Sequence, residues 1–572
     1  MLSSSWSEFQ PGDVILPSGK QYAFHYDVNG NVHTIEMPSL STHRFGALAS
    51  LSLLRLTYKP PGSHGTHLRD FDSDGRLTRV IFPSGHRRVT YDYSSSGHVA
   101  SVFHDWTDVT VTYHGEGDRV RRIASSDRLG SRFESTLEYE MTDVLVSAQR
   151  VTSSMQGSQL LDATFSYAHD AFLLVGYVDA VIGRTRLPPL NITRDAQGRT
   201  TRINDFLFAR PNFLRDVIRD ANVEIVSERD AGGRLSKQSF QFNGVVRFSL
   251  EATYTSQRRL RSWRRRSGSS DVKSYDFSYD SDGNLVSFDE NGQTRYRFEY
   301  DVNNNVQRMT HYRSVTQLQL NSFNQLLSDG QSSHIYDADG FLIQRGSDVF
   351  EFNSRAQLTH AFRAGAFDIF YYYDALGRLV ARRDALSSND VTQYFYSDLH
   401  FPNRVTHTHR HHQQETTTYF YDDHQSLFAL QRGRDMFYVA QDPLGSPIFV
   451  MNYHNSVVKR ILFDPLGRAT DSDPGFFLPF GFRGGIYDPV VGFVFFSRGH
   501  LSEGSRGGVY DTRTGRWTHP DLDTFLSNVG RTLTVPDHCN HYKFEQLVNP
   551  RAVQETDLMT GNTSQLHSSF FL

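Results

Sequence analysis

The sequence has a single cysteine, Cys539, among its 572 residues. One thiol cannot form a disulfide within the chain, so burial of apolar surface and hydrogen bonds must hold the fold together. CxxC pairs, an HExxH motif and Gly-rich phosphate-binding loops are also missing from the sequence. These are the patterns that typically hold zinc and nucleotides, so we expect no cofactor.

Long apolar runs are equally scarce. The longest, residues 46–54, is far shorter than the roughly 20 residues that a helix needs to cross a bilayer. The first thirty residues lack the apolar core of a signal peptide. We therefore expect no membrane span within this chain. Because Tyr26-Asp27 already belongs to the repeat described below, we expect the chain to begin inside a repeat array, as the later part of a longer protein.

Net charge is also small, at -4 with an isoelectric point near 6.7. No overall field attracts nucleic acid, and we expect no nucleic-acid partner. One local exception is the run of arginines from Arg258 to Arg266, which surrounds Trp263. We interpret this run as a solvated strand pair whose arginine stems cover aromatic surface, with contact to a heparan-type or other polyanion as the alternative.

Turn residues and strand aromatics are abundant instead: 42 Gly, 43 Phe and 28 Tyr against 4 Trp. They combine in a repeated unit, for example from Tyr279 to Leu285, in which an aromatic residue is followed by Asp and then Gly. The aromatic residue suits a half-buried strand, the Asp side chain can bond the amides of the turn, and the Gly can take the left-handed conformation. The unit recurs at Tyr26-Asp27, Phe71-Asp72, Tyr91-Asp92, Tyr113-His114, Tyr300-Asp301, Tyr336-Asp337, Phe352-Asn353 and Tyr373-Asp374.

The repeat predicts an all-β fold made of hairpins about 16 to 22 residues apart. Residues 130–260 are less regular, with Arg194-Asp195 and Arg229-Asp230 in place of the aromatic pair. We therefore expect that the turn geometry requires the Asp and the Gly, whereas the strand residue before the Asp only has to pack against its neighbours. A long sheet with one aromatic face must hide that face by curling on itself, as a closed or spiral shell. We expect at most short helices, near 522–527 and 211–220.

The repeat is densest between residues 437 and 550. Five blocks follow one another there, beginning at Asp442-Pro443, Val458-Lys459-Arg460-Ile461, Gly481-Phe482, Tyr510-Asp511 and Asn540-His541. Their order resembles the core of Rhs-repeat proteins and, more closely, the carboxy-terminal shell of the teneurins. The resemblance implies a YD-repeat β-hairpin barrel, possibly incomplete at its amino-terminal end, with residues 1–436 as the shell, 437–550 as the Rhs-associated core and internal plug, and 551–572 as a tail.

Two departures from the family pattern stand out. Residues 497–508 replace the short strand and aromatic-Asp turn that teneurins have there, which leaves the sheet register open. Teneurins also continue into a toxin-like domain, and bacterial relatives into an Asp-Pro-x-Gly cleavage site, neither of which follows here. Asp442-Pro443 and Asp464-Pro465 are interpreted as turns.

The resemblance implies a non-enzymatic extracellular scaffold on the outer face of the plasma membrane, within a longer single-pass protein that acts in cell–cell adhesion, signalling and neuronal or tissue development. The implied partners are teneurin self-association and an adhesion G-protein-coupled receptor of the latrophilin type. Asn191 and Asn562 lie in glycosylation patterns. The alternatives are a toxin-encapsulating Rhs or Tc-type shell, and a truncated soluble isoform with no adhesive role.

Two clusters carry candidate chemistry. His407, His409, His411 and His412 would place three imidazoles at alternate positions of a strand, a spacing that can bind zinc or copper. Arg410 and the polar residues that follow favour a solvated hairpin tip instead, so we expect no metal ligands. Ser502 lies in a partial nucleophile elbow that lacks its first Gly, and we expect no catalytic residue.

Overall fold

The computed structural model describes residues 3–7, 10–50, 52–62, 65–115, 119–140, 144–156, 158–268, 271–387, 390–497 and 507–520. Within these ranges the fold is all-β, as the sequence predicted, and the only helix is the short 3₁₀ turn η1 (Phe482–Gly484). The predicted helix at 522–527 lies outside the described residues.

The outer sheet contains the first 31 strands, and each main strand pairs antiparallel with the next one along the chain. The two-residue strands β15 and β18 are side branches, because β14 pairs with β16 and β17 with β19. The strands are β1 (Ser3–Ser7), β2 (Gln10–Ile15), β3 (Gln21–Tyr26), β4 (Val32–Glu36), β5 (Thr42–Ala49), β6 (Leu54–Lys59), β7 (His67–Phe71), β8 (Leu77–Ile81), β9 (Arg88–Tyr93), β10 (Val99–His104), β11 (Thr107–Tyr113), β12 (Val120–Asp127), β13 (Arg132–Tyr139), β14 (Val146–Met155), β15 (Ser158–Gln159), β16 (Ala163–His169), β17 (Val175–Ile182), β18 (Thr185–Arg186), β19 (Leu190–Arg194), β20 (Thr200–Ile203), β21 (Phe206–Asn212), β22 (Arg215–Asp220), β23 (Val223–Arg229), β24 (Leu235–Phe242), β25 (Val245–Tyr254), β26 (Leu260–Ser267), β27 (Asp271–Tyr279), β28 (Leu285–Glu290), β29 (Gln293–Tyr300), β30 (Val306–His311) and β31 (Ser314–Gln317).

After a two-stranded link, the chain forms a 14-stranded inner sheet and then a four-stranded central sheet. The link consists of β32 (Gln319–Leu320) and β33 (Leu326–Ser328). The inner sheet consists of β34 (His334–Tyr336), β35 (Leu342–Arg345), β36 (Asp348–Phe352), β37 (Leu358–Arg363), β38 (Phe367–Tyr373), β39 (Leu379–Asp384), β40 (Val391–Phe395), β41 (His407–Arg410), β42 (Glu415–Tyr421), β43 (Leu427–Arg432), β44 (Asp435–Gln441), β45 (Pro447–Asn452), β46 (Val457–Phe463) and β47 (Ala469–Asp471). The central sheet consists of β48 (Ile486–Asp488), β49 (Phe493–Phe496), β50 (Gly508–Asp511) and β51 (Arg516–Trp517).

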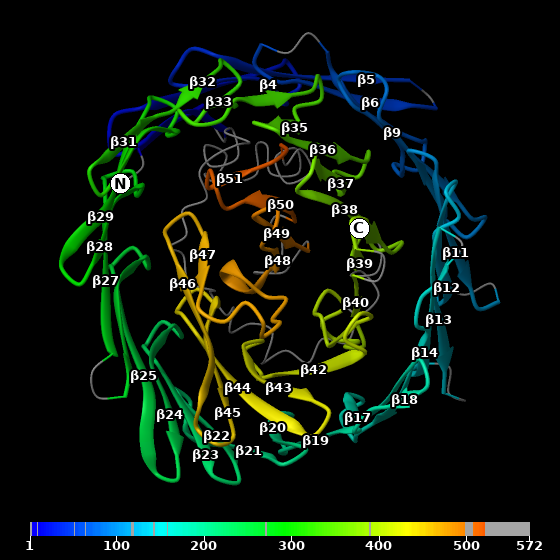
Figure 1. Ribbon diagram of the computed structural model, residues 1–572. Coiled ribbons are helices and arrows are strands. Elements are labelled where there is room, and N and C mark those ends of the chain that lie inside the picture. The colour runs from blue at the N-terminus through cyan, green and yellow to red at the C-terminus, as the bar shows by residue number, and fades with distance from the viewer. Residues whose placement is uncertain are drawn as a thin grey trace.

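The sheets form a spiral. Figure 1 shows the outer sheet running once around a ring, the inner sheet inside it, and the central sheet near the middle. Contacts between successive turns of the spiral join residues 264 positions apart at Ser18 and Asp282, near the two ends of the outer sheet, 223 at Thr200 and Asp423, and 168 at Tyr296 and Asp464. The separation shrinks because an inner path of smaller radius covers the same arc with fewer residues. No described pairing joins β31 back to β1, so the outer sheet is not closed.

The apolar core lies between the layers. The ring of Phe206 on β21 meets that of Phe428 on β43 with 4.9 Å between centroids, and Phe248 on β25 meets Phe449 on β45 at 5.1 Å. The other face of the inner sheet packs on the central sheet, where Phe350 lies 4.8 Å from Phe493. Inner strands are consequently buried on both faces.

The expected helix over 211–220 is wrong. That segment lies in the hairpin of β21 and β22, where Phe208 pairs with Ile218. The register shifts between Ala209 and Asn212, and this irregularity accommodates Pro211, which cannot donate a ladder hydrogen bond.

Most of the repeated turns have the geometry that the sequence indicates. The unit expected at Tyr91-Asp92 is displaced by two residues, because β9 continues to Tyr93 and the turn begins at Ser94. Asp280 accepts the amide of Asn284 at 2.7 Å through its side chain, and Gly283 has φ of +85°. Asn304, which stands where other units have Gly, has φ of +62°. The left-handed conformation is therefore the common requirement at this position.

The tyrosine of the unit has a second role beyond packing. The hydroxyl of Tyr279 donates to the backbone carbonyl of Leu260, the first strand residue after the preceding turn, at 2.7 Å. The same bond, at 2.7–2.9 Å, is made by Tyr93, Tyr113, Tyr139, Tyr254, Tyr300, Tyr373, Tyr396 and Tyr421. In the unit that has Arg194 at this position, the arginine guanidinium takes the place of the tyrosine hydroxyl and donates to the carbonyl of Val175 at 3.0 Å. The expectation that this residue only has to pack is therefore wrong.

We predict that Tyr373→Phe lowers the free energy of unfolding by about 1–3 kcal/mol, because the carbonyl of Leu358 loses a buried donor. Tyr373→Ala should cost about 3–5 kcal/mol, since the ring is lost as well. Denaturant unfolding followed by circular dichroism measures both values. Tyr453→Phe is the control, because Tyr453 is exposed. Equal stability of Tyr373→Phe and the unsubstituted chain would contradict this role of the hydroxyl.

Candidate functional site

The start of the outer sheet is joined to later repeats by a row of serine turns. Ser18, between β2 and β3, donates its amide and hydroxyl to the carboxylate of Asp282 at 2.8 and 2.6 Å. Ser84, between β8 and β9, donates the same two groups to Asp339 at 2.7 and 2.8 Å. Both carboxylates belong to the third residue of an Asp turn, so one geometry is used twice.

A third serine turn lies between these two. The amide of Ser39 donates to the side chain of Asn303 at 3.2 Å, and Asn303 is again the third residue of its turn. We call the contacts of Ser18, Ser39 and Ser84 the seam. Arg87 strengthens it with bonds to Asp337 at 2.6 Å and Asp339 at 2.7 Å.

The central sheet is held to the inner sheet by a buried ionic cluster. Arg345 on β35 is only 3% exposed, and its guanidinium bonds Asp348 at 2.8 Å and Asp511 of β50 at 2.7 Å. Asp348 also accepts bonds from Arg363 and from Arg513, the latter at 3.1 Å. These five residues are the ionic cluster. Because the charges are paired, removing one partner would leave another buried without compensation.

A second polar contact lies beside the ionic cluster. Asp488 on β48 accepts the hydroxyl of Tyr371 at 2.7 Å and the guanidinium of Arg382 at 2.8 Å. Burial, followed by the nearby Asp488 carboxylate, raises the pKa of the Tyr371 phenol well above its usual value. The Tyr371 phenol thus stays neutral and donates its hydrogen bond. Together, Tyr371, Arg382 and Asp488 hold the central sheet against the inner sheet.

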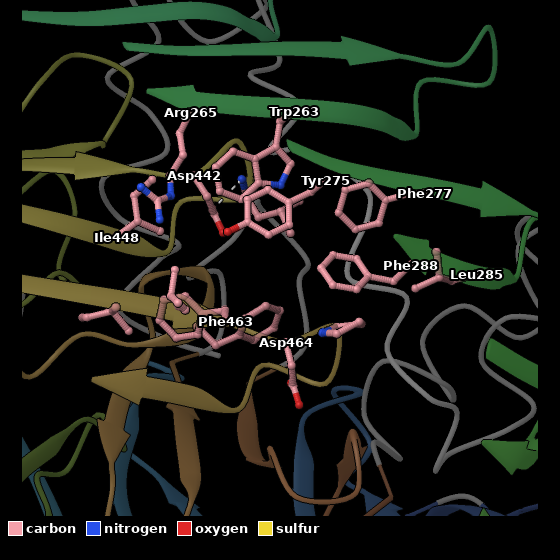
Figure 2. Close-up of a pocket in the computed structure, with 15 residues that line it drawn as sticks. Trp263, Arg265, Tyr275, Phe277, Leu285, Phe288, Asp442, Ile448, Phe463 and Asp464 are labelled. Carbon is pink, nitrogen blue, oxygen red and sulfur yellow. Dashed lines mark hydrogen bonds between the residues drawn. The ribbon is translucent and has the colours of Figure 1, made fainter. Parts of the chain in front are cut away.

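The two Asp-Pro turns face a small cavity between the layers (Figure 2). Aromatic side chains of β26 to β28, including Trp263 and Tyr275, line the cavity together with Asp442, Phe463 and Asp464 of the inner layer. The cavity encloses about 40 Å³, which is room for a few waters and far below the several hundred Å³ of a metabolite site.

Both aspartates of this cavity close turns. The Asp442 side chain accepts the amides of Leu444 and Ser446 at 2.9 and 2.8 Å. Burial raises the pKa of Asp442 to about 6 and also raises that of Asp464. The hydroxyl of Tyr296 donates to Asp464 at 2.9 Å. Each carboxyl group is therefore occupied by the fold.

The interpretation of the histidines as a solvated tip is wrong for two of them. His407 and His409 on β41 are 6% and 5% exposed, whereas His412 lies on the exposed turn. The ring of His407 lies 5.5 Å from that of Phe165 on β16, and His411 contacts Gln393 at 2.6 Å. The outer sheet covers this strand, which the local sequence does not reveal. Within the described residues no group of three or more His, Cys, Asp and Glu side chains could hold a metal.

The arginine run has the surface position that we expected for most of its members. Arg261, Arg264 and Arg266 are exposed along β26. Arg265 points inward instead, over the ring of Phe449 at 4.9 Å, and pairs with Asp271 at 3.0 Å.

The remaining sequence candidates are placed as follows. Asn191 is exposed on β19, whereas Asn562, Cys539 and Ser502 lie outside the described residues. Of the segment whose register was left open, residues 498–506 lie outside the described residues; the strands on either side of it pair directly, β49 with β50, with Phe493 opposite Asp511. The described part of the chain contains no helix long and apolar enough to cross a membrane.

The spiral of repeated hairpins around a central sheet defines a YD-repeat shell. The family model described as Teneurin YD-shell matches residues 4–549, and the chain belongs to this family. Teneurin-1 of Homo sapiens is 31% identical over 541 residues, and Teneurin-1 of Gallus gallus is 30% identical over the same length. Each alignment covers 93% of this chain and 19% of the relative, so the chain spans about a fifth of the length of these proteins.

A solved structure shares the fold. The crystal structure of TcdB2-TccC3-Cdc42 aligns with a TM-score of 0.55 and 14% identity, covering 98% of this chain and 31% of that one. At this identity the likeness concerns the fold alone, and it agrees with the Rhs-type architecture expected from the sequence.

We predict that Asp339→Ala destabilises the seam by about 1–3 kcal/mol, because two donors of Ser84 and one of Arg87 lose their acceptor. Hydrogen exchange should become faster in the turn at 82–87. Asp74→Ala is the matched control, since Asp74 occupies the same turn position but its side chain is 62% exposed. Equal effects of both substitutions would argue against the seam.

Burial of His407 should make stability depend on pH. Its pKa is lowered to about 4, below the value of about 6.5 in an unfolded chain, so the unfolded state binds the proton first as pH falls. This stability is complete above about pH 6.5 and is lost progressively toward pH 4, amounting to about 2 kcal/mol by pH 5. The free energy of unfolding, measured with urea at about pH 7.5 and about pH 5, should differ less between the two pH values in His407→Gln than in the unsubstituted chain. His412→Gln should show the same pH dependence as the unsubstituted chain. Parallel losses in both variants would contradict the assignment.

Proposed function

We propose that this chain is a non-enzymatic, extracellular scaffold within a teneurin-like cell-surface protein. Its role would be cell–cell adhesion and signalling in neuronal or tissue development, through self-association and a receptor of the latrophilin type. The observation that carries the proposal is the teneurin shell family match over residues 4–549. The protein would stand on the outer face of the plasma membrane, as part of a longer single-pass protein.

The buried polar groups support a scaffold. The ionic cluster, the Asp488 contact and the two Asp-Pro turns all use their charged atoms to join sheets or close turns. Catalytic groups need an accessible substrate position beside them, and the cavity of about 40 Å³ next to Asp442 offers room for water. We accordingly infer that the shell acts through its surface and has no catalytic activity.

The division of the chain remains part of the proposal: residues 1–436 as the shell, 437–550 as the internal plug and 551–572 as a tail. The central sheet inside the ring supports a plug, while β44 to β47 continue the inner sheet. The toxin-encapsulating alternative is less well supported, because relatives of about 30% identity over nearly the whole chain are teneurins. The exposed Asn191 is compatible with a glycan on the outer face.

We predict that deleting this shell from the full-length protein abolishes clustering of cells that express it. Clustering would be counted in suspension, with surface antibody staining to match the amount displayed. Asn191→Gln is the control that leaves the fold unchanged while removing one candidate glycan. Unchanged clustering of the deletion, at equal surface display, would contradict the adhesive role.

A further inference from the structure

One strand of the outer sheet extends past its neighbour. On one side of β5, only residues Thr42 to Arg44 pair with β4. On the other side, pairing with β6 continues from Arg44 to Ala49. Along Gly46–Ala49, the edge of β5 that faces away from β6 has no backbone partner in the part of the chain that the structure describes.

This edge is exposed on both faces. All four residues from Gly46 to Ala49 are exposed, and Leu48 retains 66% of its accessible surface. The side chain of Thr57, on the β6 side, donates to the Gly46 carbonyl at 3.2 Å. Leu54 and Leu56 of β6 are also exposed, opposite Ala49 and Ala47. The hairpin thus offers a strand edge within an apolar surface.

The usual protections of an edge strand are missing here. Proteins blunt such edges with Lys, Pro, bulges or covering loops. Residues 45–54 contain no charged residue and no proline, and the pairing of β5 with β6 runs without a register shift. The edge is therefore suited to accept another strand by main-chain hydrogen bonds.

The residues of the edge complement themselves in an antiparallel arrangement. With Ala47 opposite Ala47 of a second copy, each Leu48 opposes a Gly46 and each Phe45 opposes an Ala49, so a large side chain always meets a small one. Arg44 lies outside this contact, because Thr34 of β4 already pairs with it on that edge. Only the antiparallel arrangement has a two-fold axis, so that both copies can use the same residues.

We propose that the edge of β5 at Gly46–Ala49 is a self-association surface, on which a second copy of this chain adds its own β5 edge about a two-fold axis at Ala47. The pair is isologous, so each copy supplies the same residues. The inference rests on the proposed function, which includes self-association, and it assigns that self-association to the edge of β5. The contact is small, and we expect a weak dimer.

Sedimentation of the purified chain tests the dimer from about 1 to about 100 µM. The unsubstituted chain should pass from monomer to dimer. Ala47→Lys and Ala47→Glu should each raise the dissociation constant at least about tenfold, because like charges then face one another. An equimolar mixture of the two variants should recover the dimer. Leu207→Lys, at an exposed leucine paired on both sides, is the matched control and should dimerise normally.

Cross-linking gives a second reading. In a Cys539→Ser background, Ala47→Cys places two thiols opposite one another, at the Cβ separation of about 4.5–5.5 Å found between directly opposed residues. Mild oxidation should yield a disulfide-linked dimer, and Leu207→Cys should yield none.

Three results would overturn the proposal: a monomer at every concentration, a dimer that Ala47→Lys leaves intact, or a lack of recovery in the mixture. Circular dichroism shows whether each variant is folded. The outcome is separable from that of the adhesive role. A dimer in solution without clustering of cells would contradict adhesion alone, and clustering that Ala47→Lys does not affect would contradict this surface alone.

Discussion

One hydrogen bond recurs through many of the repeats, from a tyrosine hydroxyl to the carbonyl that follows the preceding turn. In the pair of Tyr279 and Leu260 the bond is 2.7 Å long, and it ties one hairpin to the previous one. A slip of one residue would move the ring to the other face of the sheet and lose both the packing and the bond. The register is thus set repeat by repeat, which allows a meander of 31 strands to form a regular curve.

The curve then requires a second layer. A single-layer ring would leave its aromatic inner face in water, and the inner sheet covers that face through contacts such as Phe248 with Phe449. The inner sheet needs a cover of its own, which the central sheet supplies through Phe493. In β40 all five residues are buried, because the inner sheet is covered on both faces. The spiral is therefore a consequence of where apolar surface must go.

The parts of this fold that could be predicted from sequence are the local ones. Alternating aromatics and the Asp turn with a left-handed residue predict hairpins, their spacing and a curled all-β shell. Contacts between layers could not be predicted, because they join residues far apart in the sequence, 168 positions at Tyr296 and Asp464 and 117 at Tyr371 and Asp488. For this reason His407 was assigned to a solvated tip although Phe165 covers it. Ser18 and Ser84 each lie in a Pro-Ser-Gly triplet, but nothing in the local sequence identifies Asp282 and Asp339 as their partners.

The buried polar groups of the shell bond one another, and this limits what the shell can do. Buried carboxylates such as Asp348 and Asp488 are committed to arginines and tyrosines, so they cannot act on a ligand without weakening the join between sheets. The recognition proposed for this shell would then use exposed surface, which packed layers hold in place at little entropic cost on binding. A strand edge such as that of β5 fits this logic, because main-chain groups are the polar groups that a β-shell can leave for a partner. Side chains around the edge then decide which partner is accepted.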